Sequence, residues 1–130
     1  MPTALIAEDE PLMRERLKEK LAEVWPALEI VAEAEDGDEA LALFEAHTPQ
    51  VAFLDIRMPG MSGLDVAAAI GARCHVVFIT AYDQYAVQAF ATGAVDYLLK
   101  PVETDRLRAM AERMERKLGA PPADLTALLA

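Results

Sequence analysis

Four short apolar runs in this sequence each end in residues able to take part in phosphate or metal chemistry. These residues are Glu8 with Asp9, then Asp55, Thr80 and Lys100. If the runs form parallel strands, their carboxyl ends meet at one edge of a sheet, where open α/β folds bind ligands. Three carboxylates gathered there would repel one another and raise their own pKa values. Mg²⁺ relieves such repulsion, because it prefers a few carboxylates together with waters and phosphate oxygens.

The same residues suit phosphoryl transfer. Asp55 is the predicted nucleophile, forming an acyl phosphate, while Lys100 and the Thr80 hydroxyl would hold the remaining phosphoryl oxygens. Simpler interpretations exist for single residues. Glu8 and Asp9 would favour the positive end of the helix that follows them, and Lys100 would be a solvated charge. The common position of all these residues at strand ends favours the phosphate site.

Hydrophobic periodicity supplies the elements that would position these side chains. The predicted strands, which are apolar runs, are 4–7, 29–33, 51–54, 75–79 and 95–99. The predicted helices, which repeat at helical spacing, are 13–24, 38–44, 62–70, 85–90 and 107–118. Strands rich in Val, Ile, Leu and Phe suit burial on both faces. We therefore expect an α/β fold, with a doubly wound parallel sheet of five strands and five helices.

Composition and charge exclude several classes of protein. The chain has 130 residues, of which 54% are hydrophobic, and its net charge is −10. A domain this acidic repels phosphate backbones and anionic membrane surfaces, so we expect no direct contact with nucleic acid or membrane. The longest apolar run falls well short of the ~20 residues of a membrane span, and the N-terminus lacks a signal-peptide pattern. With a single cysteine there is no internal disulfide, which fits a cytoplasmic protein.

Several other residues are predicted to be structural. Cys74 and His75 are neighbours along a strand and point to opposite faces, which disfavours a thiol–imidazole pair. Trp25, Tyr85 and Phe90 are predicted to pack into the core. None of the phosphate-loop, zinc-protease or nucleophile-elbow patterns occurs.

Four segments resemble motifs of the receiver domain of two-component response regulators, a likeness that extends over residues 1–118. They are IAEDEP (6–11), FLDIRMPGMSG (53–63), FITA (78–81) and DYLLKP (96–101). The second, which resembles the phosphoacceptor loop, is the most specific. The run TAYDQYA, which starts at Thr80, further resembles receivers of LytTR-type transcriptional regulators. The resemblance implies a flavodoxin-like (CheY-like) sheet with strand order 2-1-3-4-5.

The resemblance also implies roles for the acidic residues. Asp55 would accept a phosphoryl group from a sensor histidine kinase. Asp9, Asp55 and the backbone carbonyl of Arg57 would ligate Mg²⁺, while Glu8 would act through a bound water. The commoner acidic pair in the family is two aspartates, and the longer side chain of Glu8 can reach the same water.

A switch follows from the same resemblance. Thr80 and Lys100 would contact the phosphoryl oxygens, and the Lys100–Pro101 peptide bond would be cis. Tyr97 would turn inward as Thr80 moves, changing the surface made by the last two helices and the strand between them. Such a domain is a signalling switch rather than a turnover enzyme, and assists only its own phosphorylation and dephosphorylation.

Residues 119–130, which include Pro121 and Pro122, resemble the start of an interdomain linker. LytTR-type regulators carry a DNA-binding domain after such a linker. We therefore expect this chain to be an excised receiver that controls transcription through a C-terminal domain outside the sequence.

The last predicted helix carries a basic face opposite its apolar stripe. Its members are Arg106, Arg108, Arg113, Arg116 and Lys117. We expect a monomer or weak homodimer that tightens on phosphorylation, through the surface made by the last two helices and the strand between them. In that dimer the basic face would pair with acidic residues such as Asp96 of a second copy.

Two alternative functions compete with the switch. A Mg²⁺-dependent aspartyl phosphatase also uses an aspartate after a strand, but needs a second acid two residues later, where this chain has Arg57. A degenerate receiver that acts only as a stand-alone protein-interaction module would be expected to lack the acceptor or the lysine. Asp55 and Lys100 are both present, which favours the switch.

Overall fold

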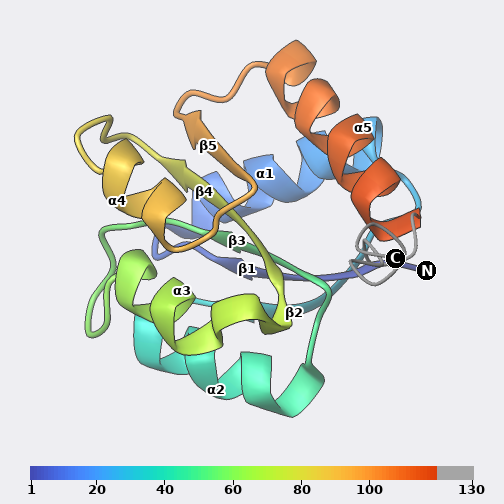
Figure 1. The fold of residues 1–130 in the computed structure, drawn as a ribbon. Coiled ribbons are helices and arrows are strands. Elements are labelled where there is room, and N and C mark those ends of the chain that lie inside the picture. The colour runs from blue at the N-terminus through green and yellow to red at the C-terminus, as the bar shows by residue number, and fades with distance from the viewer. Residues whose placement is uncertain (120–130) are drawn as a thin grey trace, which may run out of the picture.

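The computed structural model describes residues 1–119 and has a central parallel sheet with helices on both faces (Figure 1). The strands are β1 (Thr3–Ala7), β2 (Glu29–Ala34), β3 (Val51–Leu54), β4 (His75–Thr80) and β5 (Asp96–Leu99). Their order is β2-β1-β3-β4-β5, and every neighbouring pair is parallel. The predicted doubly wound sheet and its strand order are confirmed. The strand order reverses at β1 and β3, whose carboxyl ends therefore flank the usual ligand position of such sheets.

The helices divide between the two faces. On one face lie α1 (Pro11–Val24) and α5 (Thr104–Gly119), and on the other lie α2 (Gly37–His47), α3 (Gly63–Ile70) and α4 (Ala86–Ala91) (Figure 1). A short 3₁₀ turn, Gly71–Arg73, follows α3. Within residues 1–119 every helix is too short or too polar to cross a bilayer. Helix α5 continues through Gly119, where the linker was predicted to begin, and the rest of that predicted linker, 120–130, lies outside the described residues.

Residues of the central strands serve two cores. In β1, Ala4 and Ile6 pack into the core that α1 and α5 complete, whereas Leu5 and Ala7 pack into the core beneath α2 and α3. This alternation follows from the strand, whose successive side chains point to opposite faces. Every residue of β3 is buried as well. Polar groups can therefore be placed only beyond the ends of these strands, at the edge of the sheet.

Local capping signals fix the helices that border this edge. The Asp36 side chain accepts a hydrogen bond from the Glu39 amide at 2.7 Å at the start of α2. The Ser62 hydroxyl accepts one from the Asp65 amide at 3.1 Å at the start of α3. At the opposite edge of the sheet, Gly93, at φ +89°, follows the end of α4 and leads into β5 in the left-handed conformation that glycine adopts readily. The loops at the carboxyl edge thus join helices with defined starting points.

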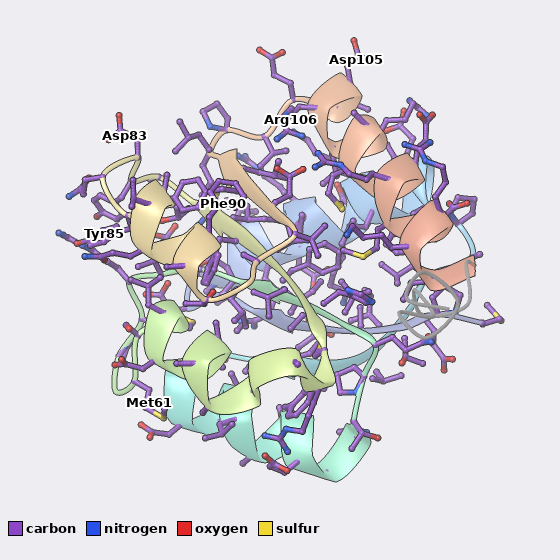
Figure 2. All side chains as sticks on the ribbon, in the orientation of Figure 1. Met61, Asp83, Tyr85, Phe90, Asp105 and Arg106 are labelled. Carbon is purple, nitrogen blue, oxygen red and sulfur yellow. The ribbon has the colours of Figure 1, made fainter. Side chains whose placement is uncertain are left out.

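Some of the residues that were predicted to be structural pack as predicted, and one does not. Trp25, after the end of α1, is only 1% exposed, and Tyr85 packs partly buried against the second core, as predicted. The prediction that Phe90 is a core residue is wrong, because its side chain is 53% exposed on α4 (Figure 2). Helix α4 has six residues and buries Ala89 fully, so the next residue along the helix faces away from the sheet. Burial raises the pKa of the Cys74 thiol to about 12, which agrees with a structural role.

Candidate functional site

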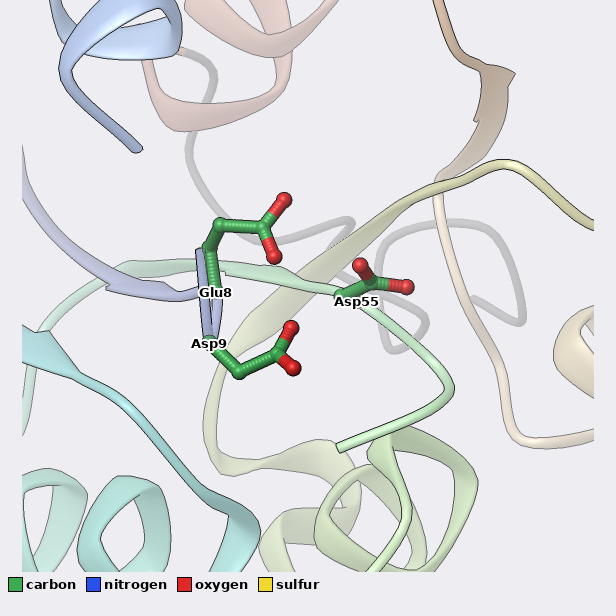
Figure 3. A group of neighbouring side chains, drawn as sticks. All are labelled: Glu8, Asp9 and Asp55. Carbon is green, nitrogen blue, oxygen red and sulfur yellow. The ribbon is translucent and has the colours of Figure 1, made fainter. Parts of the chain in front are cut away.

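Three carboxylates meet at the carboxyl ends of β1 and β3. The two strands are neighbours, with Ala7 paired with Leu54, so the residues that follow, Glu8 and Asp55, leave the sheet side by side. Oxygens of Glu8, Asp9 and Asp55 lie within 4.8 Å of one another, and the three side chains point toward a common space (Figure 3). The fold therefore brings together the acidic residues that the sequence analysis singled out.

These carboxylates differ in burial. Glu8 is 5% exposed and Asp55 is 7% exposed, whereas Asp9 is open to solvent. Desolvation disfavours the charged form and raises the pKa of Glu8, against the opposing effect of its bond from Lys100. The cluster thus offers hard oxygen donors with one side open, where waters and phosphate oxygens can complete a coordination shell. This donor set fits Mg²⁺.

Lys100 supplies a positive charge to the same cluster. It follows β5, and its amide donates to the carbonyl of Thr80 at the end of β4, at 2.9 Å. Its ammonium nitrogen lies 2.7 Å from Oδ2 of Asp55 and also donates to Oε1 of Glu8. Burial alone would lower the pKa of Lys100, but the two carboxylates outweigh burial and raise it, so the ammonium stays charged. The Lys100–Pro101 peptide bond is cis.

Asp55 is held at both of its carboxylate oxygens. Oδ2 accepts from Lys100, and Oδ1 accepts from the Ile56 amide at 2.7 Å. Charge-assisted bonds of this kind are short and directional. The orientation of the carboxylate is therefore set before any ligand arrives.

Thr80 and Tyr97 contact the same residue, Tyr82, in the loop after β4. Thr80 is fully buried, and its hydroxyl oxygen accepts a long hydrogen bond from the Tyr82 amide, at 3.4 Å. The Tyr97 hydroxyl donates to the Tyr82 carbonyl. The Tyr97 ring also lies near Phe78, with ring centroids 6.2 Å apart. A movement of the Thr80 hydroxyl would thus act on a backbone segment that Tyr97 also holds.

Sequence reasoning missed a cluster built on the Arg57 side chain. Its guanidinium lies 4.2 Å from the centre of the Tyr82 ring and donates to the Tyr85 hydroxyl at 2.9 Å. These contacts join the loop after β3 to the loop after β4. No spacing in the sequence signals them, because the partners belong to different loops.

Asp96 forms ion pairs within its own chain. It is 3% exposed, and its oxygens accept hydrogen bonds from Arg106 at 2.6 and 3.0 Å and from Arg113 at 2.9 Å. Arginines of α5 in the same chain already occupy this buried carboxylate, so a pairing of Asp96 with a second copy would require these ion pairs to open; that pairing stays a prediction. The ion pairs anchor α5 to the start of β5.

A family comparison agrees with this geometry. A sequence model described as "Response regulator receiver domain" matches residues 4–112. The chain belongs to this family. Receiver domains are the phosphorylation-controlled signalling domains of two-component systems, and they generally bind Mg²⁺ at an acidic site.

Similar curated proteins are response regulators. This receiver domain is 53% identical to an uncharacterized response regulatory protein of Vibrio cholerae, over 98% of the chain and 51% of that protein. It is 41% identical to transcriptional regulatory protein BtsR of Salmonella typhi, over 90% of the chain and 49% of that protein. The positive alginate biosynthesis regulatory protein of Pseudomonas aeruginosa is also 41% identical, over 86% of the chain and 46% of that protein. The chain thus spans about half the length of these relatives.

Solved structures of receiver domains share the fold. The receiver domain of AraT from Geobacillus stearothermophilus is 40% identical with a TM-score of 0.81, covering 90% of this chain and 95% of that one. The response regulatory domain of mrkE from Klebsiella pneumoniae is 31% identical with a TM-score of 0.84, covering 90% and 98%.

Proposed function

We propose that this receiver domain is a phosphorylation-activated switch in which Asp55 accepts a phosphoryl group from a sensor histidine kinase. The setting of Asp55 carries the proposal. It is a buried carboxylate bonded to Lys100 on one side and clustered with Glu8 and Asp9 on the other. A nucleophile, a cation for phosphoryl oxygens and a set of metal ligands are the parts that phosphoryl transfer requires.

The residues at the strand ends would hold the metal. Asp9, Asp55 and the backbone carbonyl of Arg57 are the proposed Mg²⁺ ligands, and Glu8 would contact the ion through a water. Bound Mg²⁺ neutralises charge shared between carboxylates and phosphoryl oxygens. The exposed position of Asp9 supports this assignment, because it leaves one side of the cluster open to waters and to the phosphodonor.

Within the chain, the transfer needs positioning more than covalent chemistry. The Ile56 amide and the Lys100 ammonium hold the two oxygens of Asp55 in place. One of these oxygens forms a bond to phosphorus as the bond from phosphorus to the kinase histidine nitrogen breaks, and the electron pair leaves with the imidazole. The Lys100 ammonium then pairs with a phosphoryl oxygen, and the Thr80 hydroxyl donates to another.

The Thr80–Tyr82–Tyr97 contacts provide the proposed route to the surface. When the Thr80 hydroxyl turns to the phosphoryl group, its long bond with the Tyr82 amide is lost. The carbonyl of Tyr82 is the partner of the Tyr97 hydroxyl, so Tyr97 is freed to turn inward. The surface that changes is formed by α4, β5 and α5.

The exposed surface of α4 and β5 and the names of the relatives support proposals for the partners of this domain and for its output. Val87 is 84% exposed, Phe90 53% and Leu99 48%, so α4 and β5 present apolar area suited to a second copy. We propose a homodimer through α4, β5 and α5 that tightens on phosphorylation. Because BtsR, a similar protein, is named a transcriptional regulatory protein, we also propose that 120–130, after α5, begins a linker to a DNA-binding output domain, and that the protein acts in the cytoplasm.

Intact-protein mass spectrometry with acetyl phosphate and Mg²⁺ tests the proposal. We expect a Mg²⁺-dependent gain of one phosphoryl group in the parent protein and none in an Asp55→Asn variant, which keeps the size of the side chain. No gain in a folded parent protein would favour the interaction-module alternative. Rapid, sustained turnover of an aryl phosphate would favour the phosphatase, whereas the switch carries one phosphoryl group per molecule and loses it slowly.

A further inference from the structure

The loop between β3 and α3 rests directly on the start of α2. This acceptor loop, residues 56–62, contains the Arg57 carbonyl that is proposed as a metal ligand. The Gly37 amide, in the first turn of α2, donates to the Pro59 carbonyl of the loop at 3.2 Å. Gly37 is buried beneath the loop, so two backbones meet there without a side chain between them.

A side chain at position 37 has no room. A Cβ there would lie 1.9 Å from the carbonyl oxygen of Met61 and 2.6 Å from the carbonyl carbon. Both are backbone atoms, which cannot rotate aside as the end of a flexible side chain can. The acceptor loop and the start of α2 would have to separate.

A second glycine makes the same approach from the loop side. Gly60 lies at φ +73°, and a Cβ on it would be 2.2 Å from Oδ2 of Asp38 in the first turn of α2. Here the obstacle is the end of a side chain, which can move, although an alanine at this positive φ would be strained whatever the space. Both glycines thus allow the same close approach of the loop to α2, but the atoms that a Cβ would meet are fixed at position 37 and movable at position 60.

Of the two segments in contact, the start of α2 is held more tightly in place than the acceptor loop. Asp36 caps the helix by accepting from the Glu39 amide at 2.7 Å, and the Glu39 carboxylate accepts from the Glu35 amide at 3.2 Å. These reciprocal bonds resemble a capping box, which fixes the first turn of a helix. A clash at position 37 would therefore displace the loop rather than the helix.

We propose that Gly37 is a positioning residue for the metal site. By letting the acceptor loop lie against α2, it determines where the Arg57 carbonyl stands relative to Asp9 and Asp55, which follow strands and would stay in place. The inference rests on the proposed function, because it takes that carbonyl as a ligand of Mg²⁺.

Calorimetric titration of the full chain with Mg²⁺ tests the inference in four proteins: the parent, Gly37→Ala, Gly60→Ala and Gly71→Ala. Gly71 is the control for backbone strain and is matched to Gly60, since it has φ +61° but nothing within 4 Å of its Cβ position. We expect Gly37→Ala to raise the Kd for Mg²⁺ about tenfold or more, as loss of outer support for a metal ligand does. Gly60→Ala should raise it less, and Gly71→Ala should leave it unchanged. The Mg²⁺ concentration for half-maximal phosphorylation by acetyl phosphate should rise by the same factors, while the rate at saturating Mg²⁺ changes less.

Each contrary result has a separate meaning. A folded Gly37→Ala protein with the Kd of the parent overturns the inference, and so does an equal loss of affinity in Gly71→Ala, which would indicate general destabilisation. If circular dichroism shows Gly37→Ala to be unfolded, Gly60→Ala decides, and a parent-like Kd in that variant overturns the inference. A parent protein that binds no Mg²⁺ overturns the proposed metal site itself, and the inference with it.

Discussion

The ammonium nitrogen of Lys100 lies 2.7 Å from Oδ2 of Asp55 and joins it to the carboxylate of Glu8. Lys100 comes from the far end of the chain, 92 residues after Glu8. The contact therefore links the residues that follow β1, β3 and β5 at the carboxyl edge of the sheet. It also places the positive charge that phosphoryl oxygens need directly beside the proposed acceptor.

Replacing Lys100 by methionine leaves Glu8 and Asp55 without the cation they share. We expect the free energy of unfolding to fall by about 1–3 kcal/mol without metal, as when one member of a buried polar pair is removed. Saturating Mg²⁺ should restore part of this loss, because it supplies positive charge to the same carboxylates. Urea denaturation with and without Mg²⁺ measures both effects. Lys18→Met, which removes a surface pair with Glu33, is the control and should change little; equal losses in the two variants would contradict the prediction.

Asp96→Asn should weaken the attachment of α5. The substitution removes the charge that two arginines share, and we expect a loss of about 1–3 kcal/mol in the free energy of unfolding, reduced by the partial exposure of the arginines. Asp105→Asn is the comparison, since Asp105 points outward at the start of α5 (Figure 2). Chemical denaturation that gives the same stability for both variants would argue against an anchoring role for Asp96.

Arg57→Ala should loosen the loop after β4. The guanidinium bridges the ring of Tyr82 and the hydroxyl of Tyr85, so its removal frees a segment that is otherwise tied to the acceptor loop. We expect backbone amides of residues 81–86 to exchange hydrogen several-fold faster, since local opening governs exchange in such loops. Hydrogen exchange read by mass spectrometry measures the effect, with Arg116→Ala on α5 as the control. Unchanged exchange in this segment would mean that the cluster does not restrain the loop.

The Cys74 thiol should resist alkylation in the folded protein. Burial raises its pKa to about 12 from an ordinary value of 9.0. At pH 8 the reactive thiolate is therefore rarer by about a factor of a thousand, because each pKa unit above the pH reduces it tenfold. Because the unfolded thiol ionises at lower pH than the folded one, the domain also loses stability as the pH rises above about 9. Iodoacetamide labelling, followed by mass with and without urea, should be far slower without urea; equal rates would contradict the burial of this thiol.

The sequence was sufficient to place the acidic edge because strand ends can be located from apolar runs. Glu8, Asp55 and Lys100 each interrupt such a run, and a parallel sheet gathers the ends of its strands at one edge. The starts of α2 and α3 also depend on nearby residues alone, because Asp36 and Ser62 carry the capping side chains. These features depend on a few neighbouring residues or on the topology of the sheet.

Contacts between side chains of distant elements could not be predicted in this way. Arg57 meets Tyr82 only because two loops approach each other, and periodicity contains no information about loop conformation. The basic face of α5 was identified, but its pairing with Asp96 of the same chain depends on how α5 lies against β5. The outward position of Phe90 likewise depends on a helix too short to bury two faces.

The buried position of Trp25 has a spectroscopic consequence. It is the single tryptophan, 1% exposed, and it lies after the end of α1, whose fourteen residues separate it from the acidic edge by about 21 Å. Its fluorescence will change when the domain unfolds and the indole is exposed to water. The fluorescence will hardly change when an ion or a phosphoryl group binds at Asp55. Emission therefore reports folding alone, which allows the folded fraction of every variant to be monitored in the same cuvette while the metal is titrated.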